Sequence, residues 1–403
     1  MKTLIIDSSY LMYKSYFAYP NLNYKLNNID IPVGAFFGFV KTILSLLVEY
    51  KPDQLVFAGD TNKPTWRHIL ASKVSQDAYK GNRTEIEQNL VSQIPLIQNW
   101  CHKVSLNDYR LEGWEADDII FSIAVDELTN FQSIRKQKVV EQYSAISDNL
   151  FENPKSLPEF PTRFDELLQH ANQYANSIYI YSSDRDLYQM LSLPNLHFIH
   201  TGKLGYENFS ATNFVNKYEL SPLQWLDYKA MVGDGSDNLK GVEGIGAKTA
   251  TGFLQGVGSL YSFFEYIETI ETPSKDEKTS KLNKSPFLRT ASGSWDNKTS
   301  NNSLDSHSVD NKVQQKTNVK TKLEAYFQNP KNQKLIQKIQ DNYEVIKYTY
   351  LMSSLQPVPS VKFQASGFNL SNGIVDLEKF GFKSLITMTK KLEPQLEVQE
   401  GLF

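Results

Sequence analysis

Three short apolar runs of branched and aromatic residues recur along the chain, and each is followed within three residues by an aspartate. Runs of this kind, bounded by polar turns, are typical of strands that are buried on both faces of a parallel sheet. Because parallel strands end at the same edge of a sheet, we expect the aspartates to gather at that edge. The runs are Leu4–Ile6 before Asp7, Leu55–Ala58 before Asp60, and Ile178–Tyr181 before Asp184 and Asp186.

Helical patterns lie between these runs. Residues 36–50 form one stretch of helical length, and residues 117–128 place Ile119, Ile120 and Ile123 on one side. The alternation of strands and helices predicts an α/β fold with a central, mostly parallel sheet.

Two polar stretches divide the chain. Residues 129–176 are irregular and proline-containing, and we interpret them as an insertion. Residues 271–322 include a run rich in Ser, Asn and Lys that cannot bury enough apolar surface to fold, so we expect a disordered linker. The remaining regions are an α/β domain at 1–200, a smaller region at 201–270 and a helical region at 323–403. In the last of these, one apolar stripe at helical spacing predicts core packing: Leu335, Ile339, Tyr343, Ile346 and Tyr350.

The composition excludes several function classes. Lys and Arg total 42 and Asp and Glu total 45, a net charge of −3, which excludes a chain-wide polycation but permits a local basic patch. The single cysteine, Cys101, excludes an internal disulfide and a cysteine-ligated zinc site, and predicts a buried, inert thiol. No apolar run approaches the roughly 20 residues that span a bilayer. No signal-peptide core follows the N-terminus. We therefore expect a soluble cytoplasmic protein without a membrane partner.

Nine acidic residues stand out as a set. Any one of them alone is equally well explained as a helix cap or a solvated turn. If they converge, their repulsion must be relieved by protons or by divalent cations, and oxygen-only ligands suit Mg²⁺ or Mn²⁺. Two such ions held by carboxylates are suited to phosphodiester hydrolysis. The acids are Asp7, Asp60, Glu115, Asp117, Asp118, Asp184, Asp186, Asp234 and Asp237.

Seven motifs in order extend this pattern over residues 1–265. They are Leu-Ile-Ile-Asp (4–7), Phe-Ala-Gly-Asp (57–60), Trp-Arg-His (66–68), Tyr-Lys-Gly-Asn-Arg (79–83), Glu-Ala-Asp-Asp (115–118), Ser-Ser-Asp-Arg-Asp (182–186) and the Gly-Asp-Gly-Ser-Asp segment that continues to Lys248. With these motifs the chain resembles the flap endonuclease and 5′-nuclease family. That family includes the 5′-3′ exonuclease domain of bacterial DNA polymerase I and the stand-alone bacteriophage 5′-exonucleases, to which the chain is most similar.

The resemblance implies two Mg²⁺ ions, with Mn²⁺ able to substitute. Residues expected to hold the first ion are Asp7, Asp60, Glu115, Asp117 and Asp184. Residues expected to hold the second are Asp186, Asp234 and Asp237. Asp118 is expected to act through water. The aspartates Asp184 and Asp186 are thereby expected to take part in catalysis.

The resemblance also implies a helical arch over the site, at about residues 61–96. Lys80 and Arg83 match catalytic residues that engage the scissile phosphate and the threaded 5′ strand. Arg67 and Tyr79 are further candidates for DNA binding, because cations beside aromatic faces suit a single strand whose bases stack. The basic stretch taken alone would equally suit a solvated helix.

The segment Gly241–Lys248 is rich in glycine but is not a P-loop, because Ala247 stands between Gly246 and Lys248. It resembles a helix-hairpin-helix, which assigns duplex DNA binding to the region at 201–270. Gly244 and Gly246 permit the hairpin, backbone amides of the next helix meet a phosphate, and Lys248 adds a contact. In the family, K⁺ often binds there.

The expected function is that of a structure-specific 5′-nuclease of DNA replication and repair. It would cleave 5′ flaps and remove 5′-terminal DNA or RNA-primer nucleotides near the junction with duplex. We expect a monomer, in the host cytoplasm if the gene is carried by a phage. The alternatives are a non-catalytic junction-binding module and a PIN-type ribonuclease. The C-terminal Gln399–Phe403 resembles peptides that bind sliding clamps, and a frayed tail is its alternative.

Overall fold

The structure of the protein, a computed structural model, describes residues 1–74, 78–83, 87–129, 176–271, 320–358, 361 and 367–400. The predicted insertion at 129–176 and the predicted linker at 271–322 lie almost wholly outside these residues, as do the side chains of the predicted clamp-binding tail. The strands are β1 (Lys2–Asp7), β2 (Asn23–Leu26), β3 (Ile29–Pro32), β4 (Gln54–Ala58), β5 (Asp108–Tyr109), β6 (Ser177–Tyr181), β7 (Leu196–Thr201), β8 (Tyr206–Phe209), β9 (Gly233–Asp234) and β10 (Leu239–Lys240). The helices are α1 (Ser8–Ala18), α2 (Gly34–Tyr50), α3 (Trp66–Val74), α4 (Gln88–Val91), α5 (Ile94–Val104), α6 (Ala116–Thr129), α9 (Ala211–Tyr218), α10 (Trp225–Val232), α11 (Ala247–Val257), α12 (Leu260–Glu271), α14 (Gln333–Asp341), α15 (Tyr343–Ser353), α16 (Ile374–Lys379) and α17 (Lys383–Glu400), with 3₁₀ helices η1 (Asp186–Ser192), η2 (Pro222–Gln224), η4 (Pro330–Asn332) and η5 (Leu370–Gly373).

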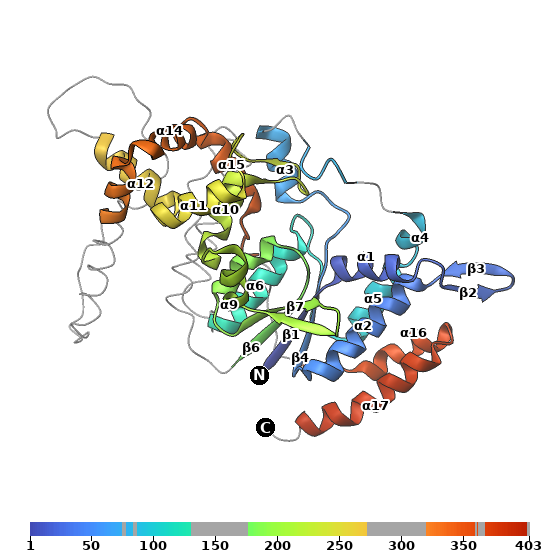
Figure 1. Ribbon diagram of the computed structural model, residues 1–403. Helices are drawn as coiled ribbons and strands as arrows, with labels where there is room; N and C mark the ends of the chain where they lie inside the picture. The colour runs from blue at the N-terminus through green and yellow to red at the C-terminus, as the bar shows by residue number, and fades with distance from the viewer. Residues whose placement is uncertain are drawn as a thin grey trace, which may run out of the picture.

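The central sheet has the strand order β5-β4-β1-β6-β7-β8, and all neighbours are parallel except β7 and β8. The three strands predicted from the apolar runs are β1, β4 and β6, and they lie side by side at its centre (Figure 1). The mostly parallel α/β fold is therefore confirmed.

Helices cover both faces of the sheet, as strands that are apolar on both faces require. Alternate residues of each strand join different clusters, because side chains in a strand point to opposite faces in turn. Ile5 and Val56 pack in the cluster that contains α6, whereas Leu4 and Phe57 pack in the cluster that contains α2 and α5. All four are fully buried, which stabilises the fold by about 1.5–3 kcal/mol for each side chain.

A helix-hairpin-helix follows the sheet and confirms that part of the predicted fold. Helix α10 leads into the β9–β10 hairpin, and a loop then leads into α11. The hairpin needs glycine at Gly233, where φ is +82° and a Cβ would lie 2.4 Å from the backbone nitrogen of Gly241.

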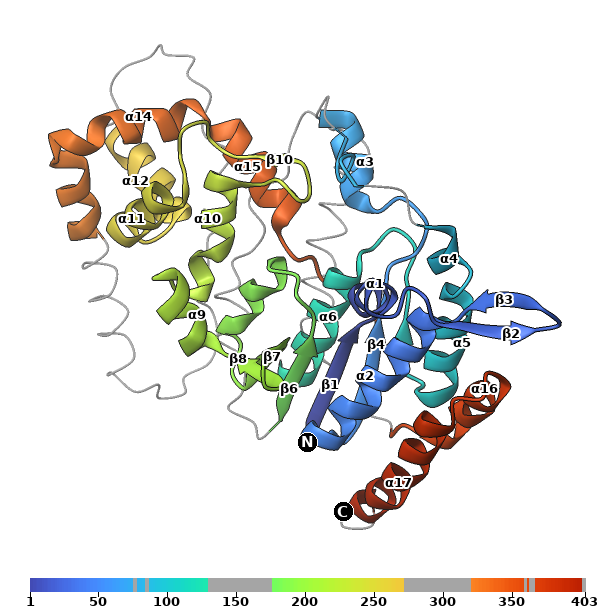
Figure 2. The same ribbon diagram turned by 45° about the vertical axis from the view of Figure 1, so that its right-hand side comes forward.

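The C-terminal helices pack in two places. Helices α14 and α15 lie with the helix-hairpin-helix, and α15 packs along α10. Helices α16 and α17 lie on the α2 side of the sheet, where α17 packs on α2 and α16 packs on α17 (Figures 1 and 2). Ile339 and Ile346 are fully buried in the core, as the apolar stripe predicted.

Two expectations from composition can be compared with the structure. Cys101 is fully buried, and this burial raises the pKa of its thiol well above the usual range, as expected for an inert thiol. Among the helices of the described residues, none has both the length and the apolar composition needed to cross a bilayer.

Candidate functional site

The carboxyl ends of the central strands bring the predicted aspartates to one edge of the sheet. Asp7 ends β1, where its Oδ1 accepts the Tyr10 N–H (2.9 Å) and its Oδ2 accepts the Ser182 hydroxyl (2.7 Å). Asp60 follows β4, and its Oδ1 accepts the N–H of Ala116 at the start of α6 (2.8 Å). These bonds fix the carboxylates to the strand ends and to the first turn of the following helices, where helix amides favour negative charge.

Asp7, Asp117 and Asp184 are three acids of this edge whose pKa is raised. Burial raises the pKa of Asp7 to about 7, and Asp60 and Asp184 add to the rise. Burial also raises the pKa of Asp117 well above its usual range, with further contributions from Asp184 and Asp7. The pKa of Asp184 is raised by its burial as well. Raised pKa values of this kind mark repulsion that a divalent cation would relieve, and carboxylate oxygens are the donors that suit Mg²⁺.

The turn at residues 78–83 docks on the loop at residues 233–238, although the two are about 150 residues apart in the chain. Three of the hydrogen bonds between them involve backbone atoms: Asn82 Nδ2 to Gly235 O (2.7 Å), Asn238 Nδ2 to Ala78 O (3.0 Å) and Lys80 N to Asp237 O (3.1 Å). Two of the recognised motifs therefore form one surface at the edge of the sheet.

Cations of this turn pair with the acids opposite. Lys80 Nζ lies 2.9 Å from Glu115 Oε2, and Arg83 Nη2 lies 2.8 Å from Asp237 Oδ1. Burial would raise the pKa of Glu115, but Arg67 and Lys80 outweigh this effect and lower it to about 2. Glu115 is therefore a permanent carboxylate.

Lys229 is a residue of the site that the sequence analysis missed. It lies on α10 with a side chain 6% exposed, in contact with Asp186 and 2.5 Å from Asp234. Burial would raise the pKa of Asp234, but Lys229 and Ser236 lower it to about 2. Helix spacing gave no signal for this residue, because side-chain pairs on a helix form three or four residues apart, whereas Asp234 lies five residues after Lys229 and beyond the end of α10.

These cations divide the nine acids into smaller groups. Within the part of the chain that the structure describes, no three Asp, Glu, His or Cys side chains stand together as a metal-binding group. Lys229 lies between two of the acids assigned to the second ion, and Lys80 holds one assigned to the first. The predicted metal ligands thus share one edge, with protein cations interleaved among them.

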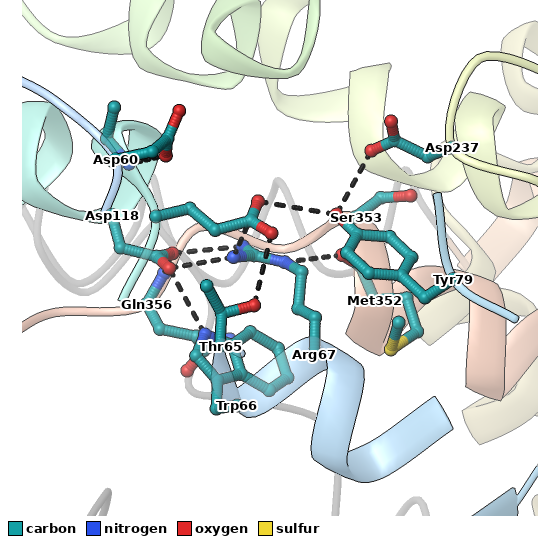
Figure 3. Close-up of polar contacts among 12 residues, drawn as sticks. Asp60, Thr65, Trp66, Arg67, Tyr79, Asp118, Asp237, Met352, Ser353 and Gln356 are labelled. Carbon is teal, nitrogen blue, oxygen red and sulfur yellow. Dashed lines mark hydrogen bonds and ion pairs between the residues drawn. The ribbon is translucent and has the colours of Figure 1, made fainter. Parts of the chain in front are cut away.

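The structure differs from the predictions for Arg67 and Asp118. Arg67 is 3% exposed and makes a bidentate ion pair with Asp118, at 2.7 and 2.9 Å (Figure 3). The two oxygens of Asp118 also accept the Trp66 indole N–H (3.1 Å) and the Gln356 backbone N–H (2.8 Å). A carboxylate has about four acceptor positions, so those of Asp118 are all in use. In this arrangement protein partners occupy the guanidinium of Arg67, which is then unavailable to DNA. They also occupy the carboxylate of Asp118, which is then unavailable to a metal ion or its bound water.

Tyr79 also differs from its prediction as a stacking residue. Its ring is 6% exposed, and its hydroxyl donates to Glu115 Oε2 (3.3 Å) and Asp237 Oδ2 (3.1 Å). A buried ring has no free face for a base. Tyr79 instead bridges Glu115 and Asp237, the two acids that form ion pairs with Lys80 and Arg83.

The predicted hairpin residues are accessible. Gly244, Gly246 and Lys248 are exposed, and α11 begins after Gly246 without a side-chain cap. The first amides of a helix without a side-chain cap are suited to a phosphate.

Known proteins resemble the chain over both parts of its fold. The model described as 5′-3′ exonuclease, N-terminal resolvase-like domain matches residues 2–139, and the model described as 5′-3′ exonuclease, C-terminal SAM fold matches residues 220–289. The 5′-3′ exonuclease of Mycoplasmopsis pulmonis is 30% identical over 277 residues, which cover 69% of this chain and 74% of that protein. The thermostable DNA polymerase I of Thermus thermophilus is 29% identical over 277 residues, and this chain spans 26% of its length.

One solved structure with a similar arrangement is the bacteriophage T5 5′-exonuclease with bound zinc, at 15% identity and a TM-score of 0.49, covering 98% of this chain and all of that one (100%). The family assignment rests on the two family models and on the Mycoplasmopsis relative. The chain therefore belongs to the 5′-3′ exonuclease family.

Proposed function

We propose that the protein is a structure-specific 5′-nuclease of DNA replication and repair. It hydrolyses phosphodiester bonds near single-strand/duplex junctions, cutting 5′ flaps and removing 5′-terminal DNA or RNA-primer nucleotides. The observation that carries the proposal is the docking of the turn at 78–83 on the loop at 233–238, which sets phosphate-binding cations against the acids at the sheet edge.

The roles of the side chains follow from charge and exposure. Lys80 and Arg83, with side chains 16% and 54% exposed, stand between the acids and solvent. From there they bind the scissile phosphate and stabilise the charge that grows on it during hydrolysis. Lys80 is held at φ +56°, a conformation that is uncommon outside glycine and that clusters at functional sites.

Two divalent cations, Mg²⁺ in the cell and Mn²⁺ as a substitute, fit the acids chemically. Asp7, Asp60, Glu115, Asp117 and Asp184 would hold the first, and Asp186, Asp234 and Asp237 the second. When bound, they would activate water and neutralise charge on the phosphate. The raised pKa values of Asp7, Asp117 and Asp184 support this assignment. Asp118 is not included, because its oxygens are saturated by protein donors.

The exposed hairpin at Gly244, Gly246 and Lys248 would bind a duplex phosphate away from the acids and thereby set the distance of the cut from the junction. K⁺ is a candidate ligand of the same hairpin. We further propose that Gln399–Phe403 binds a sliding clamp. A pull-down with and without these five residues tests this, and equal retention contradicts it.

A labelled 5′-flap duplex tests the function. We expect cleavage near the junction with Mg²⁺ and none with EDTA, and an Asp184→Asn variant that binds the flap without cutting it. Parallel DNA and RNA flaps separate the proposal from its alternatives. Cleavage of RNA alone would indicate a PIN-type ribonuclease. Binding to the junction without cleavage in Mg²⁺ or in Mn²⁺ would indicate a non-catalytic module.

A further inference from the structure

The guanidinium of Arg67 is held inside the protein by four hydrogen bonds and an ion pair (Figure 3). A guanidinium carries five N–H donors in a fixed fork and no acceptor. The hydrogen bonds of Arg67 go to Met352 O (Nε, 2.8 Å), Asp118 Oδ2 (Nη1, 2.7 Å), Asp118 Oδ1 (Nη2, 2.9 Å) and Ser354 O (Nη2, 2.7 Å), and the ion pair joins Nη1 to Glu115 Oε2 at 3.4 Å. Because the side chain is only 3% exposed, Arg67 offers no accessible donor to a phosphate.

The partners come from segments far apart in the chain. Arg67 lies in the first turn of α3, Asp118 lies in the first turn of α6, and Glu115 directly precedes α6. The carbonyls belong to residues 352–354 at the end of α15, outside the residues that the family models match. Asp118 binds the same segment through the N–H of Gln356. One guanidinium therefore joins the base of the arch, the helix of the acidic motif and the C-terminal segment.

Helix α15 also reaches the hairpin side of the molecule. Its Thr349 hydroxyl donates to Lys240 O at 2.7 Å, and the helix packs along α10. The residues that hold Arg67 are thus anchored to the helix-hairpin-helix, while Arg67 approaches Glu115. The position of Glu115 depends on this support as well as on its pairing with Lys80.

We propose that Arg67 is a positioning residue for the nuclease reaction and does not contact DNA. It positions the Glu115 carboxylate at the proposed metal site, and it links α3 to residues 352–356. Through these two contacts it also determines the position of Lys80, which pairs with Glu115. This inference rests on the proposed function, because it gives Arg67 a task in metal binding and phosphate positioning.

Arg67→Lys is a demanding test, because lysine keeps the charge but loses the planar fork. A single ammonium with three donors cannot satisfy the carboxylate pair and both carbonyls. We expect the variant to fold, to bind a 5′-flap duplex in Ca²⁺ within about twofold of the parent, and to bind Mn²⁺ at least tenfold more weakly. The kcat in Mg²⁺ should fall at least 100-fold, with KM for the flap within threefold. Mn²⁺ binding is followed without DNA, by the loss of the free-ion EPR signal.

Lys248→Ala supplies the contrasting pattern. As a phosphate contact distant from the acids, it should weaken flap binding and leave Mn²⁺ binding unchanged. If Arg67→Lys gives the Lys248→Ala pattern, or leaves both kcat and Mn²⁺ affinity intact, the positioning role is wrong.

If Arg67→Lys does not fold, the variant Trp66→Phe tests the proposal by the same measurements. It deletes only the indole N–H to Asp118 and should weaken Mn²⁺ binding at least threefold, whereas no change contradicts the proposal. A parent protein that binds Mn²⁺ but cuts no flap would overturn the proposed function separately.

Discussion

Asp117 and Asp118 are neighbours in the first turn of α6, yet the structure predicts opposite effects on stability when each is replaced by asparagine. Asp118 forms a bidentate pair with Arg67, and both side chains are almost fully buried, at 0% and 3% exposed. Asp117 lies among acids, and its burial together with Asp184 and Asp7 raises its pKa. Both changes remove one negative charge from the same helix terminus, so the loss of helix-dipole stabilisation is shared.

The two substitutions are expected to change the free energy of unfolding in different directions. Breaking a buried ion pair costs about 3–5 kcal/mol, because the remaining charge is left without a partner. Asp118→Asn leaves Arg67 in that state, and an amide N–H would also face the Arg67 or Trp66 donors. A carboxyl whose folded-state pKa is raised loses stability as the pH rises above its unfolded pKa. Asp117→Asn removes that loss at pH 8 and should leave the protein as stable as the parent, or more stable.

Thermal unfolding in EDTA at pH 8, followed by circular dichroism, measures both variants. For a chain of 403 residues each kcal/mol shifts Tm by about 1.2 °C, so Asp118→Asn should unfold at least about 3.5 °C below the parent, and Asp117→Asn at or above it. If Asp118→Asn unfolds with the parent while Asp117→Asn unfolds early, Asp118 is not a structural ion-pair partner and the reasoning from its contacts fails.

Three further variants test single contacts. Lys80→Ala should slow flap cleavage at least about 100-fold with a much smaller loss of DNA affinity, measured by single-turnover kinetics and by binding in Ca²⁺, because its cation acts on the phosphate in the transition state. Lys229→Met should lower stability in EDTA by about 2 kcal/mol in denaturant titrations, since Asp186 and Asp234 then face each other without a cation. Lys248→Ala should weaken duplex binding for all sequences alike and reduce the slope of log K against log salt by about one, if it contacts one phosphate.

The fold could be predicted as far as its local patterns reach. Strands β1, β4 and β6 follow from apolar runs because each is buried on both faces. Their order β4-β1-β6 in the sheet was not predicted, because parallel pairing is compatible with several orders. The short strands β5 and β8 carried no comparable pattern and were not predicted. The packing of α17 on α2 also lay beyond the sequence analysis, because an amphipathic helix shows that it is partnered but not by which surface.

The candidate site shows the same limit more sharply. The acids at the strand ends were identified because strand and turn are adjacent in sequence. Arg67 was assigned to DNA because its neighbours are basic and aromatic, whereas the carbonyl that binds its Nε lies 285 residues further on. Composition cannot distinguish a solvated arginine from a buried one when the partner is a backbone atom so distant in the chain.

The distribution of charge explains how motifs so far apart in the chain support one another. A carboxylate is costly to bury unless it is paired. Cations from one motif pair with acids from another: Lys80 with Glu115, Arg83 with Asp237, and Lys229 of α10 with Asp186 and Asp234. The docking of residues 78–83 on residues 233–238 is thereby coupled to charge compensation. Asp7 and Asp117 keep raised pKa values, so these ion pairs relieve only part of the repulsion at the sheet edge.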